Sequence, residues 1–255
     1  MNGLYSCIIA ISMYSKIPMP NVEWSEDRMR YVMCFFPLVG IVQGAALGLW
    51  LHFALDVLNL SVGAAALTGA AIPLLVTGGI HMDGFLDTMD AIHSYGDRSR
   101  KLEILKDPHC GAFAVIRLCT YFLAYFCFVF CIRFTPRVGL CWTLALVLER
   151  GLSGLAVAAF PMAKNTGLAH TFATAADRES VQKILIVLSV LLAAALIALG
   201  GGALVAAALL VLWRYHHVAV KEFGGITGDL AGWFLQKAEF WMLAALAASQ
   251  WGGIL

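Results

Sequence analysis

Long apolar stretches dominate this chain of 255 residues and leave few folds open to it. A helix that crosses a lipid bilayer needs about 20 mostly apolar residues, and seven stretches come close to that length. They cover residues 33–58, 61–80, 112–132, 138–160, 184–199, 203–219 and 236–255. The fifth and sixth are short, flank a run of three glycines, and could instead form a broken hairpin. The sequence therefore predicts an all-α fold: a polytopic membrane helical bundle with six or seven transmembrane helices in a single domain, residues 1–255.

The overall composition excludes most other classes of protein. Hydrophobic residues make up 61% of the chain and charged residues only 13%, whereas a soluble domain has about 50% and 25%. An ordinary soluble enzyme, a disordered chain and a nucleic-acid-binding protein are therefore excluded, and we expect the chain to lie in a lipid bilayer. Residues 4–14 form an apolar run too short to span it, so we expect an interfacial or re-entrant helix there.

The basic residues indicate how the helices are oriented. With the N-terminus in the cytoplasm and seven spans, most of the 17 Lys and Arg residues fall in cytoplasmic segments, and only Arg133 and Arg137 fall outside. Cytoplasmic loops are enriched in positive charge, so this orientation is favoured over the reverse. It places the C-terminus outside and predicts a multi-pass protein of the cytoplasmic (inner) membrane.

Three aspartates follow the second apolar stretch at helical spacing. Asp83, Asp87 and Asp90 stand at positions i, i+4 and i+7, which share one face of a helix. Three like charges on one face repel one another, so we expect a compensating cation. Mg²⁺ prefers hard oxygen ligands and is typically held by few carboxylates together with substrate phosphates. The spacing therefore predicts a magnesium site, with a solvated acidic loop as the alternative.

A histidine and several basic residues flank these aspartates. Arg98, Arg100 and Lys106 follow them, and such side chains suit phosphate oxygens. Carboxylates for a metal next to cations for phosphate indicate a pyrophosphate-type substrate on the cytoplasmic face. The alternative is that these cations serve only as a topology signal. His81 either contacts phosphate or metal or simply lies at the membrane interface.

A second group of polar residues lies in a glycine-rich loop, residues 221–232, before the last apolar stretch. Thr227 and Asp229 offer oxygen ligands there, on the same predicted side of the membrane as Asp83. Glycines allow tight turns and close approach to a ligand. The loop is therefore a candidate to complete the metal site, with a flexible turn between helices as the alternative.

Ionisable residues also occur inside the predicted spans. Arg117 and the adjacent pair Glu149 and Arg150 are examples. Such residues are costly within a membrane and often functional. They either form a structural ion pair or face the substrate cavity.

Several motifs occur in an order typical of one family. Residues 77–90 match Thr-Gly-Gly-x-His-x-Asp-Gly-x-x-Asp-x-x-Asp, and residues 102–107 are close to Leu-Glu-Ile-Met-Lys-Asp. Residues 224–229 match Gly-Gly-x-Thr-Gly-Asp, with a later glutamate at Glu239, and residues 15–20 are similar to Thr-Arg-x-Pro-x-Pro. Over most of its length the chain thus resembles the cobalamin synthase family, the adenosylcobinamide-GDP ribazoletransferases.

The resemblance implies an integral membrane transferase that joins adenosylcobinamide-GDP to α-ribazole or its 5′-phosphate, with GMP as the other product and Mg²⁺ as cofactor. The implied fold is similar to that of CDP-alcohol phosphotransferases, and by fold analogy a homodimer is expected. Lys16 stands where the family usually has Arg, which keeps the charge but loses the bidentate geometry. Pro108 and His109 stand where Ser-Arg is usual.

These considerations assign roles to individual residues. The expected metal ligands are Asp83, Asp87, Asp90 and Asp229. The expected catalytic residues are Asp83, Asp87, Asp90 and His81. The expected substrate-binding residues are Lys16, Arg98, Arg100, Lys106, Arg150 and Thr227.

Two other functions are alternatives at this stage. A CDP-alcohol phosphatidyltransferase shares the metal chemistry, but its usual motif has Ala-Arg soon after Asp-Gly and wider gaps between carboxylates. Here Asp87 follows Gly84 by three residues and no such Arg is present. A transporter would explain charges inside spans, but the carboxylates cluster near one predicted membrane face and no inverted repeat is visible.

Overall fold

The computed structural model describes residues 2–255 and is built from helices, with no strand in this range. Segments rich in apolar and helix-forming residues satisfy their backbone hydrogen bonds internally, as a membrane requires. In chain order the elements are α1 (Asn2–Tyr14), α2 (Glu26–Met29), α3 (Val32–Phe35), α4 (Pro37–His52), the π-helical turn η1 (Phe53–Val57), α5 (Val62–Gly69), α6 (Ile72–Thr77), α7 (Ile80–His93), α8 (Arg98–Ile104), α9 (Ala112–Cys131), α10 (Pro136–Ala159), α11 (Leu168–Ala175), α12 (Arg178–Ala198), α13 (Gly202–Val218), the π-helical turn η2 (Ala219–Phe223) and α14 (Gly228–Trp251).

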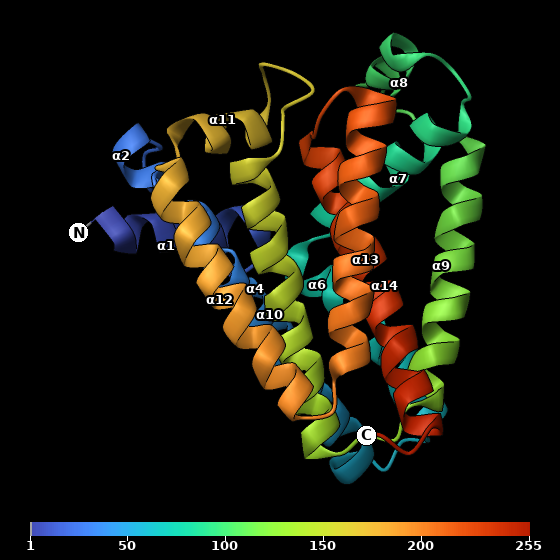
Figure 1. Cartoon of the computed structure of the whole chain (residues 1–255). Coiled ribbons are helices and arrows are strands. Elements are labelled where there is room, and N and C mark those ends of the chain that lie inside the picture. Colours follow the sequence, from blue (N-terminus) through green and yellow to red (C-terminus); the bar gives the residue numbers. More distant parts are fainter. Residues whose placement is uncertain (1) are drawn as a thin grey trace.

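The long helices run side by side and form a bundle (Figure 1). α10 packs against α4, α12 and α14, and α14 packs against α7, α13, α10 and α9. Most of the side chains of α10 and α14 are buried, whereas α9, α12 and α13 expose large apolar side chains on their outer faces. The predicted polytopic membrane helical bundle is therefore confirmed. α10 and α14 form its interior, and α9, α12 and α13 belong to its periphery.

Counted by length and apolarity, the described residues hold five spans, or six if one bent helix pair is a single span, and six agrees with the lower of the two predicted numbers. Five helical segments within residues 2–255 are long and apolar enough to cross a membrane: Pro37–Val57, Ala112–Cys131, Pro136–Ala159, Arg178–Ala198 and Gly202–Phe223. The last two are 21 and 22 residues long, so the broken hairpin considered for this region does not form. α14, expected as the seventh span, has 24 residues but is less apolar than these five segments, because it carries charged residues such as Lys237 and Glu239. Most of its side chains are buried within the bundle.

The predicted second span, residues 61–80, is not one straight helix. The helical segment Val62–Thr77 is followed by Ile80–His93 at an angle of 96°, so the pair makes at most one broken span or a re-entrant loop. The bend falls at Gly78 and Gly79, whose φ angles of 66° and 82° lie in the left-handed region that glycine adopts without steric cost. The glycine pair therefore turns the chain sharply just before the aspartates.

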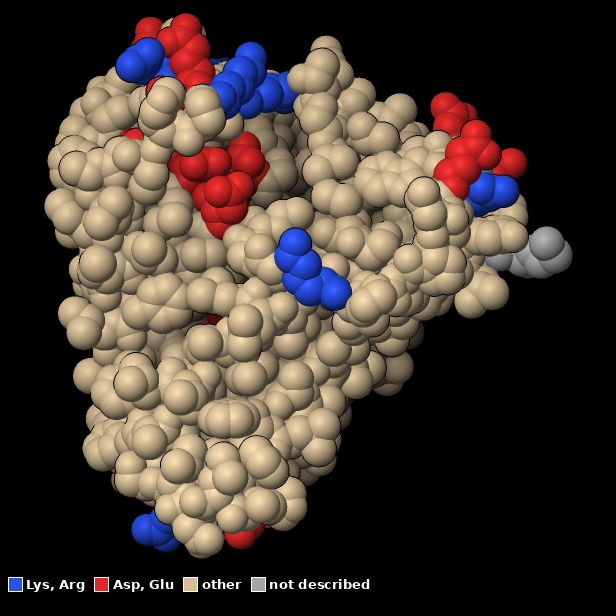
Figure 2. Space-filling view, turned by 180° about the vertical axis from the view of Figure 1, so that it is seen from behind, with Lys and Arg blue, Asp and Glu red and all other residues tan. Residues whose placement is uncertain are grey.

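On the face seen in Figure 2, most charged side chains lie near the top of the molecule, at its upper right edge and at its bottom tip. The broad belt above the bottom tip is nearly free of charge, with one basic side chain and a small acidic patch in view, and a compact acidic group lies in a hollow near the top. A belt of this kind is what a bilayer requires of a multi-pass protein. The C-terminus lies at the end of the bundle opposite α8 (Figure 1).

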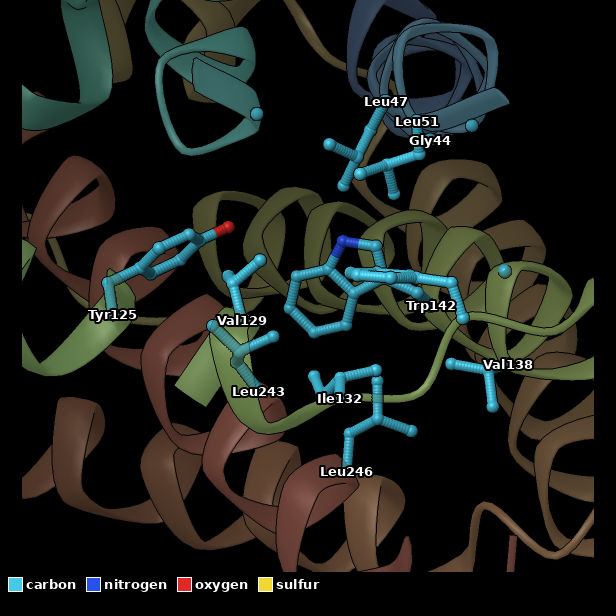
Figure 3. A pocket seen from close by; sticks show the side chains of 14 residues that line it. Gly44, Leu47, Leu51, Tyr125, Val129, Ile132, Val138, Trp142, Leu243 and Leu246 are labelled. Carbon is cyan, nitrogen blue, oxygen red and sulfur yellow. The ribbon is translucent and has the colours of Figure 1, made fainter. Parts of the chain in front are cut away.

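A small apolar cavity of about 40 Å³ lies between α4, α9, α10 and α14. Leu47, Trp142, Leu243 and Leu246 are among the side chains that surround it (Figure 3). The hydroxyl of Tyr125, at its edge, donates a hydrogen bond to Glu239 over 2.9 Å. A space this small and apolar offers little polar chemistry, so we interpret it as a packing gap.

Two glycines bring α4 close to α10. A Cβ atom at Gly40 would lie 2.5 Å from the carbonyl oxygen of Leu146, and one at Gly44 would overlap the side chain of Thr143. Gly48 continues the same four-residue repeat, but a Cβ atom there would meet nothing within 4 Å. The close helix contact therefore depends on Gly40 and Gly44.

We expect the substitution Gly40→Ala to lower the free energy of unfolding by about 1–3 kcal/mol, because the added methyl group displaces the backbone of α10. The matched substitution Gly48→Ala has open space and should change it by less than about 1 kcal/mol. Thermal unfolding of the purified variants in detergent measures both effects. Equal losses of stability in the two variants would contradict this account of the α4–α10 contact.

Candidate active site

α7 carries three carboxylates on one face and an apolar face opposite them. Asp83 is exposed, and Asp87 and Asp90 are half-buried, whereas Phe85 and Met89 are buried against the bundle. Among residues 2–255 none of the three carboxylates has an ion-pair partner within 4.0 Å. The helical face predicted from the spacing is therefore present, and its negative charge is not neutralised by a nearby basic side chain.

A fourth carboxylate, Asp229, joins them from the start of α14. Thr227 caps this helix: its hydroxyl oxygen accepts a hydrogen bond from the Leu230 amide over 3.2 Å and its hydroxyl donates to Asp229 over 3.3 Å. α7 and α14 approach closely here, because a Cβ atom at Gly84 would lie 2.8 Å from the Cα atom of Asp229. The charges of Asp83, Asp90 and Asp229 all act on Asp87, so Asp229 lies within electrostatic range of the carboxylates of α7.

A cavity of about 300 Å³ opens beside Asp83 and Asp229. His81 lines it and is 4% exposed. Its ring stacks with Tyr14 at a centroid distance of 6.0 Å and meets the edge of Phe36 at 5.7 Å. The Nε2 atom of His81 is buried and has no hydrogen-bond partner among residues 2–255. The cavity is therefore lined by two carboxylates, the aromatic side chains of Tyr14 and Phe36, and His81.

Two loops at this end are tied together by backbone hydrogen bonds. The amide of Ala163 donates to the carbonyl of Ile226 over 2.9 Å, and the amide of Ile226 donates to that of Pro161 over 2.8 Å. Gly225 has a φ of 154°, and a Cβ atom there would lie 2.5 Å from the Pro161 oxygen. The glycine therefore permits the contact that fixes residues 160–167 beside residues 224–227.

This contact brings in Lys164, which the sequence analysis did not single out. Lys164 is half-buried and donates a hydrogen bond to the Leu102 carbonyl over 3.4 Å. Burial lowers the pKa of its ammonium group from the ordinary value; Asp229 opposes this and Lys106 adds to it. The charge of Lys164 therefore acts on Asp229, and the charge of Lys106 acts on Lys164. The only available signal in the sequence was the position of Lys164 in a loop on the predicted cytoplasmic side.

The other predicted phosphate ligands are held by contacts of their own. Arg98 packs over Gly224 and donates to the Val220 carbonyl over 3.4 Å. Arg100 is exposed and pairs with Glu103 at 3.2 Å. Arg98 therefore joins α8 to η2, and Arg100 pairs within α8. Neither side chain forms an ion pair with a carboxylate of α7.

Lys16 is the predicted cation that lies beside Asp83. Its aliphatic stem packs on Gly78, and its backbone amide donates to the Val76 carbonyl over 2.8 Å. Lys16 and Asp83 line the same shallow depression. The carboxylate of Asp90, at the far end of the acidic face, packs against Gly111. The acidic face is therefore bordered by Lys16 at one end and by the chain after α8 at the other.

Arg150 lies in a buried polar network and does not line the cavity. It is 1% exposed and donates hydrogen bonds to Glu149 over 2.6 Å and to the side-chain oxygen of Gln43. Gln43 in turn donates to Glu239 over 3.2 Å, and Tyr125 donates to the same carboxylate. Of the two interpretations of the Glu149–Arg150 pair, the contacts favour the structural ion pair, and the network joins α4, α9, α10 and α14.

The four carboxylates fit a shared magnesium site better than a site made by protein alone. No three Asp, Glu, His or Cys side chains within the described part of the chain form a group that could by itself hold an ion. Mg²⁺ usually keeps several waters and takes only one or two carboxylates together with substrate phosphates. Unpaired carboxylates beside a cavity, with lysines at its border, suit this mode of binding.

Comparisons with known proteins agree on one family. Residues 6–247 match the family model described as cobalamin-5-phosphate synthase. The chain is 45% identical over 250 residues to the adenosylcobinamide-GDP ribazoletransferase of Lachnoclostridium phytofermentans, which covers 97% of this chain and 94% of that protein. It is 32% identical over 248 residues to the protein of the same name from Clostridium perfringens strain 13, covering 94% and 96%. No solved structure matches this chain.

We expect the substitution Arg150→Gln to lower the free energy of unfolding by about 3–5 kcal/mol, because it leaves the Glu149 carboxylate buried without its partner. The double variant Glu149→Gln/Arg150→Gln should recover part of this loss. Thermal unfolding in detergent measures the difference. If Arg150→Gln kept full stability and only raised the KM for a substrate, the structural interpretation would be wrong.

Proposed function

Because the chain belongs to the cobalamin-5-phosphate synthase family, we propose that it is an adenosylcobinamide-GDP ribazoletransferase of cobalamin biosynthesis. It would join adenosylcobinamide-GDP to α-ribazole or its 5′-phosphate and release GMP. The observation that carries this proposal is the set of unpaired carboxylates on α7 opposite Asp229, because transfer of a phosphoryl group from a diphosphate requires a site for cations and phosphates. The family match favours this activity over a lipid phosphotransferase or a transporter.

The carboxylates of Asp83, Asp87, Asp90 and Asp229 would hold Mg²⁺ between the protein and the diphosphate. When bound, such an ion neutralises negative charge that develops on the leaving group. Thr227 would keep the Asp229 carboxylate oriented through the hydrogen bond already present. These four residues and Thr227 thus form the proposed acidic half of the site.

The basic half of the proposed site comes from lysines at its border. Lys16, Lys106 and Lys164 would bind the phosphate oxygens of the GDP moiety, since an ammonium group acts as a point charge toward phosphate. Arg98 and Arg100 would support them by fixing α8 and the loop after η2. Arg150 was expected to bind substrate, but its side chain is enclosed in the buried network, so it has no substrate-binding role in this proposal.

The chemistry requires one proton acceptor. The ribazole hydroxyl oxygen forms a bond to the phosphorus attached to cobinamide, the bond from that phosphorus to the GMP phosphate breaks, and the hydroxyl proton passes to Asp87 or Asp90 as general base. His81, which lines the cavity, would contact the substrate there. We place this site on the cytoplasmic face of the inner membrane, where the predicted topology puts α7 and α8. A homodimer remains an expectation by fold analogy.

We expect Asp83→Asn to reduce GMP release from adenosylcobinamide-GDP and α-ribazole 5′-phosphate by about 100-fold or more, because the charge that balances the cation is lost. The matched control Asp27→Asn removes an exposed carboxylate on α2 and should keep full activity. Thermal unfolding must be unchanged in both variants. Near-normal GMP release by the folded Asp83→Asn protein would refute the assignment.

Removal of divalent cations provides an independent test. We expect a chelator to abolish GMP release by the wild-type protein and added Mg²⁺ to restore it, since the four carboxylates are expected to bind substrate phosphates only through a shared ion. Isothermal titration of Mg²⁺ in the presence of GDP measures binding without turnover. Full activity in the presence of chelator would contradict the metal assignment while leaving the family membership intact.

A further inference from the structure

A second, larger cavity of about 740 Å³ lies between α7, α9, α13 and α14. Met89 and Ile92 of α7 line it. These residues lie on the opposite face of the helix from Asp83, Asp87 and Asp90, because successive residues advance by about 100°. The cavity is therefore separate from the proposed active site, and nothing in the proposed reaction uses it.

Four basic side chains line this cavity, and three of them, from three helices, have no ion-pair partner within residues 2–255. Arg117 comes from α9, Arg214 from α13 and Lys237 from α14. The charges of Arg117 and Arg214 both act on Lys237. Like charges held near one another in a poorly screened environment repel, so their arrangement calls for an anion.

No carboxylate of the described chain supplies that anion. Arg117 donates only to the His93 Nε2 atom, over 2.8 Å, and Lys237 lies over the ring of Phe85 at 5.7 Å. Arg214 has no ion-pair partner within residues 2–255. Glu222 also borders the cavity, but its carboxylate is taken by Lys101 at 2.5 Å.

The surroundings of the cavity are those of a lipid-facing site. α9 and α13 both belong to segments apolar enough to cross a membrane. Leu210 and Trp241 line the cavity and are 64% and 52% exposed, so its mouth opens on the apolar outer surface of the bundle. Tryptophan is enriched where membrane proteins meet lipid headgroups.

We propose that this cavity binds the phosphate headgroup of an anionic glycerophospholipid. Arg117, Arg214 and Lys237 would contact the phosphate, and the acyl chains would lie along the apolar outer faces of α9 and α13. Basic pockets between transmembrane helices are suited to anionic lipid headgroups. A free phosphate compound would satisfy the same three cations but would leave the apolar mouth uncovered.

Native mass spectrometry of the purified full-length protein tests this assignment. Delipidated protein is titrated with phosphatidylglycerol or with zwitterionic phosphatidylcholine. Because each cation near a headgroup contributes about a fivefold change in affinity, Arg214→Gln/Lys237→Gln should weaken phosphatidylglycerol binding by about 25-fold. The control Arg133→Gln/Lys183→Gln removes the same charge outside the cavity and should leave binding unchanged. Arg117→Lys/Arg214→Lys keeps the charge but loses the bidentate geometry, so it should weaken binding less than the variant that removes two charges.

Two results would overturn the proposal. One is equal affinity of the cavity variant and the wild-type protein for phosphatidylglycerol. The other is displacement of the bound lipid by inorganic phosphate or α-ribazole 5′-phosphate, which would reassign the cavity to a soluble phosphate compound. Far-ultraviolet circular dichroism confirms that each variant is folded. Since binding is measured without turnover, neither result depends on the proposed transferase activity.

Discussion

The sharp turn at Gly78 and Gly79 is the constraint on which the candidate site depends. A helix with three unpaired carboxylates cannot continue through hydrocarbon, because each buried charge would cost several kcal/mol. The chain turns through 96° before the first of them, so the apolar face of α7 packs on the bundle while Asp83 lines the cavity that Asp229 also lines. The same turn packs Lys16 against Gly78 and leaves it beside Asp83.

The buried network around Arg150 fixes the frame that holds α7. Five polar side chains are enclosed between α4, α9, α10 and α14, namely Gln43, Tyr125, Glu149, Arg150 and Glu239. Removing charged groups from water raises the free energy of the folded protein, and this is offset only when each group is paired. The network therefore favours one register of these helices over others, and α14, fixed in this way, presents Asp229 to α7.

The spacing of residues in the sequence predicted the features that depend on a single helix, but it did not predict features that depend on contacts between several helices. The face formed by Asp83, Asp87 and Asp90 follows from helical period alone and is present in the structure. The position of Asp229 near α7 was predicted because its loop and Asp83 were expected on the same side of the membrane. Hydropathy could not show that α14 is an interior helix, because a window average does not distinguish lipid-facing from protein-facing residues. Lys164 was missed because only the contact between two distant loops places it near Asp229.

α7 separates two groups of opposite charge. Its carboxylates face the proposed active site, and its other face borders the cavity with Arg117, Arg214 and Lys237. A helix is about 10 Å across, which is no more than the Debye length at 0.1 M salt, and the protein between them screens less than water does. If both sites bind the ions proposed for them, an attraction across α7 is therefore expected. A cation held by the carboxylates would make the cavity more attractive to an anion, and by thermodynamic reciprocity an anion in the cavity would favour the cation by the same factor.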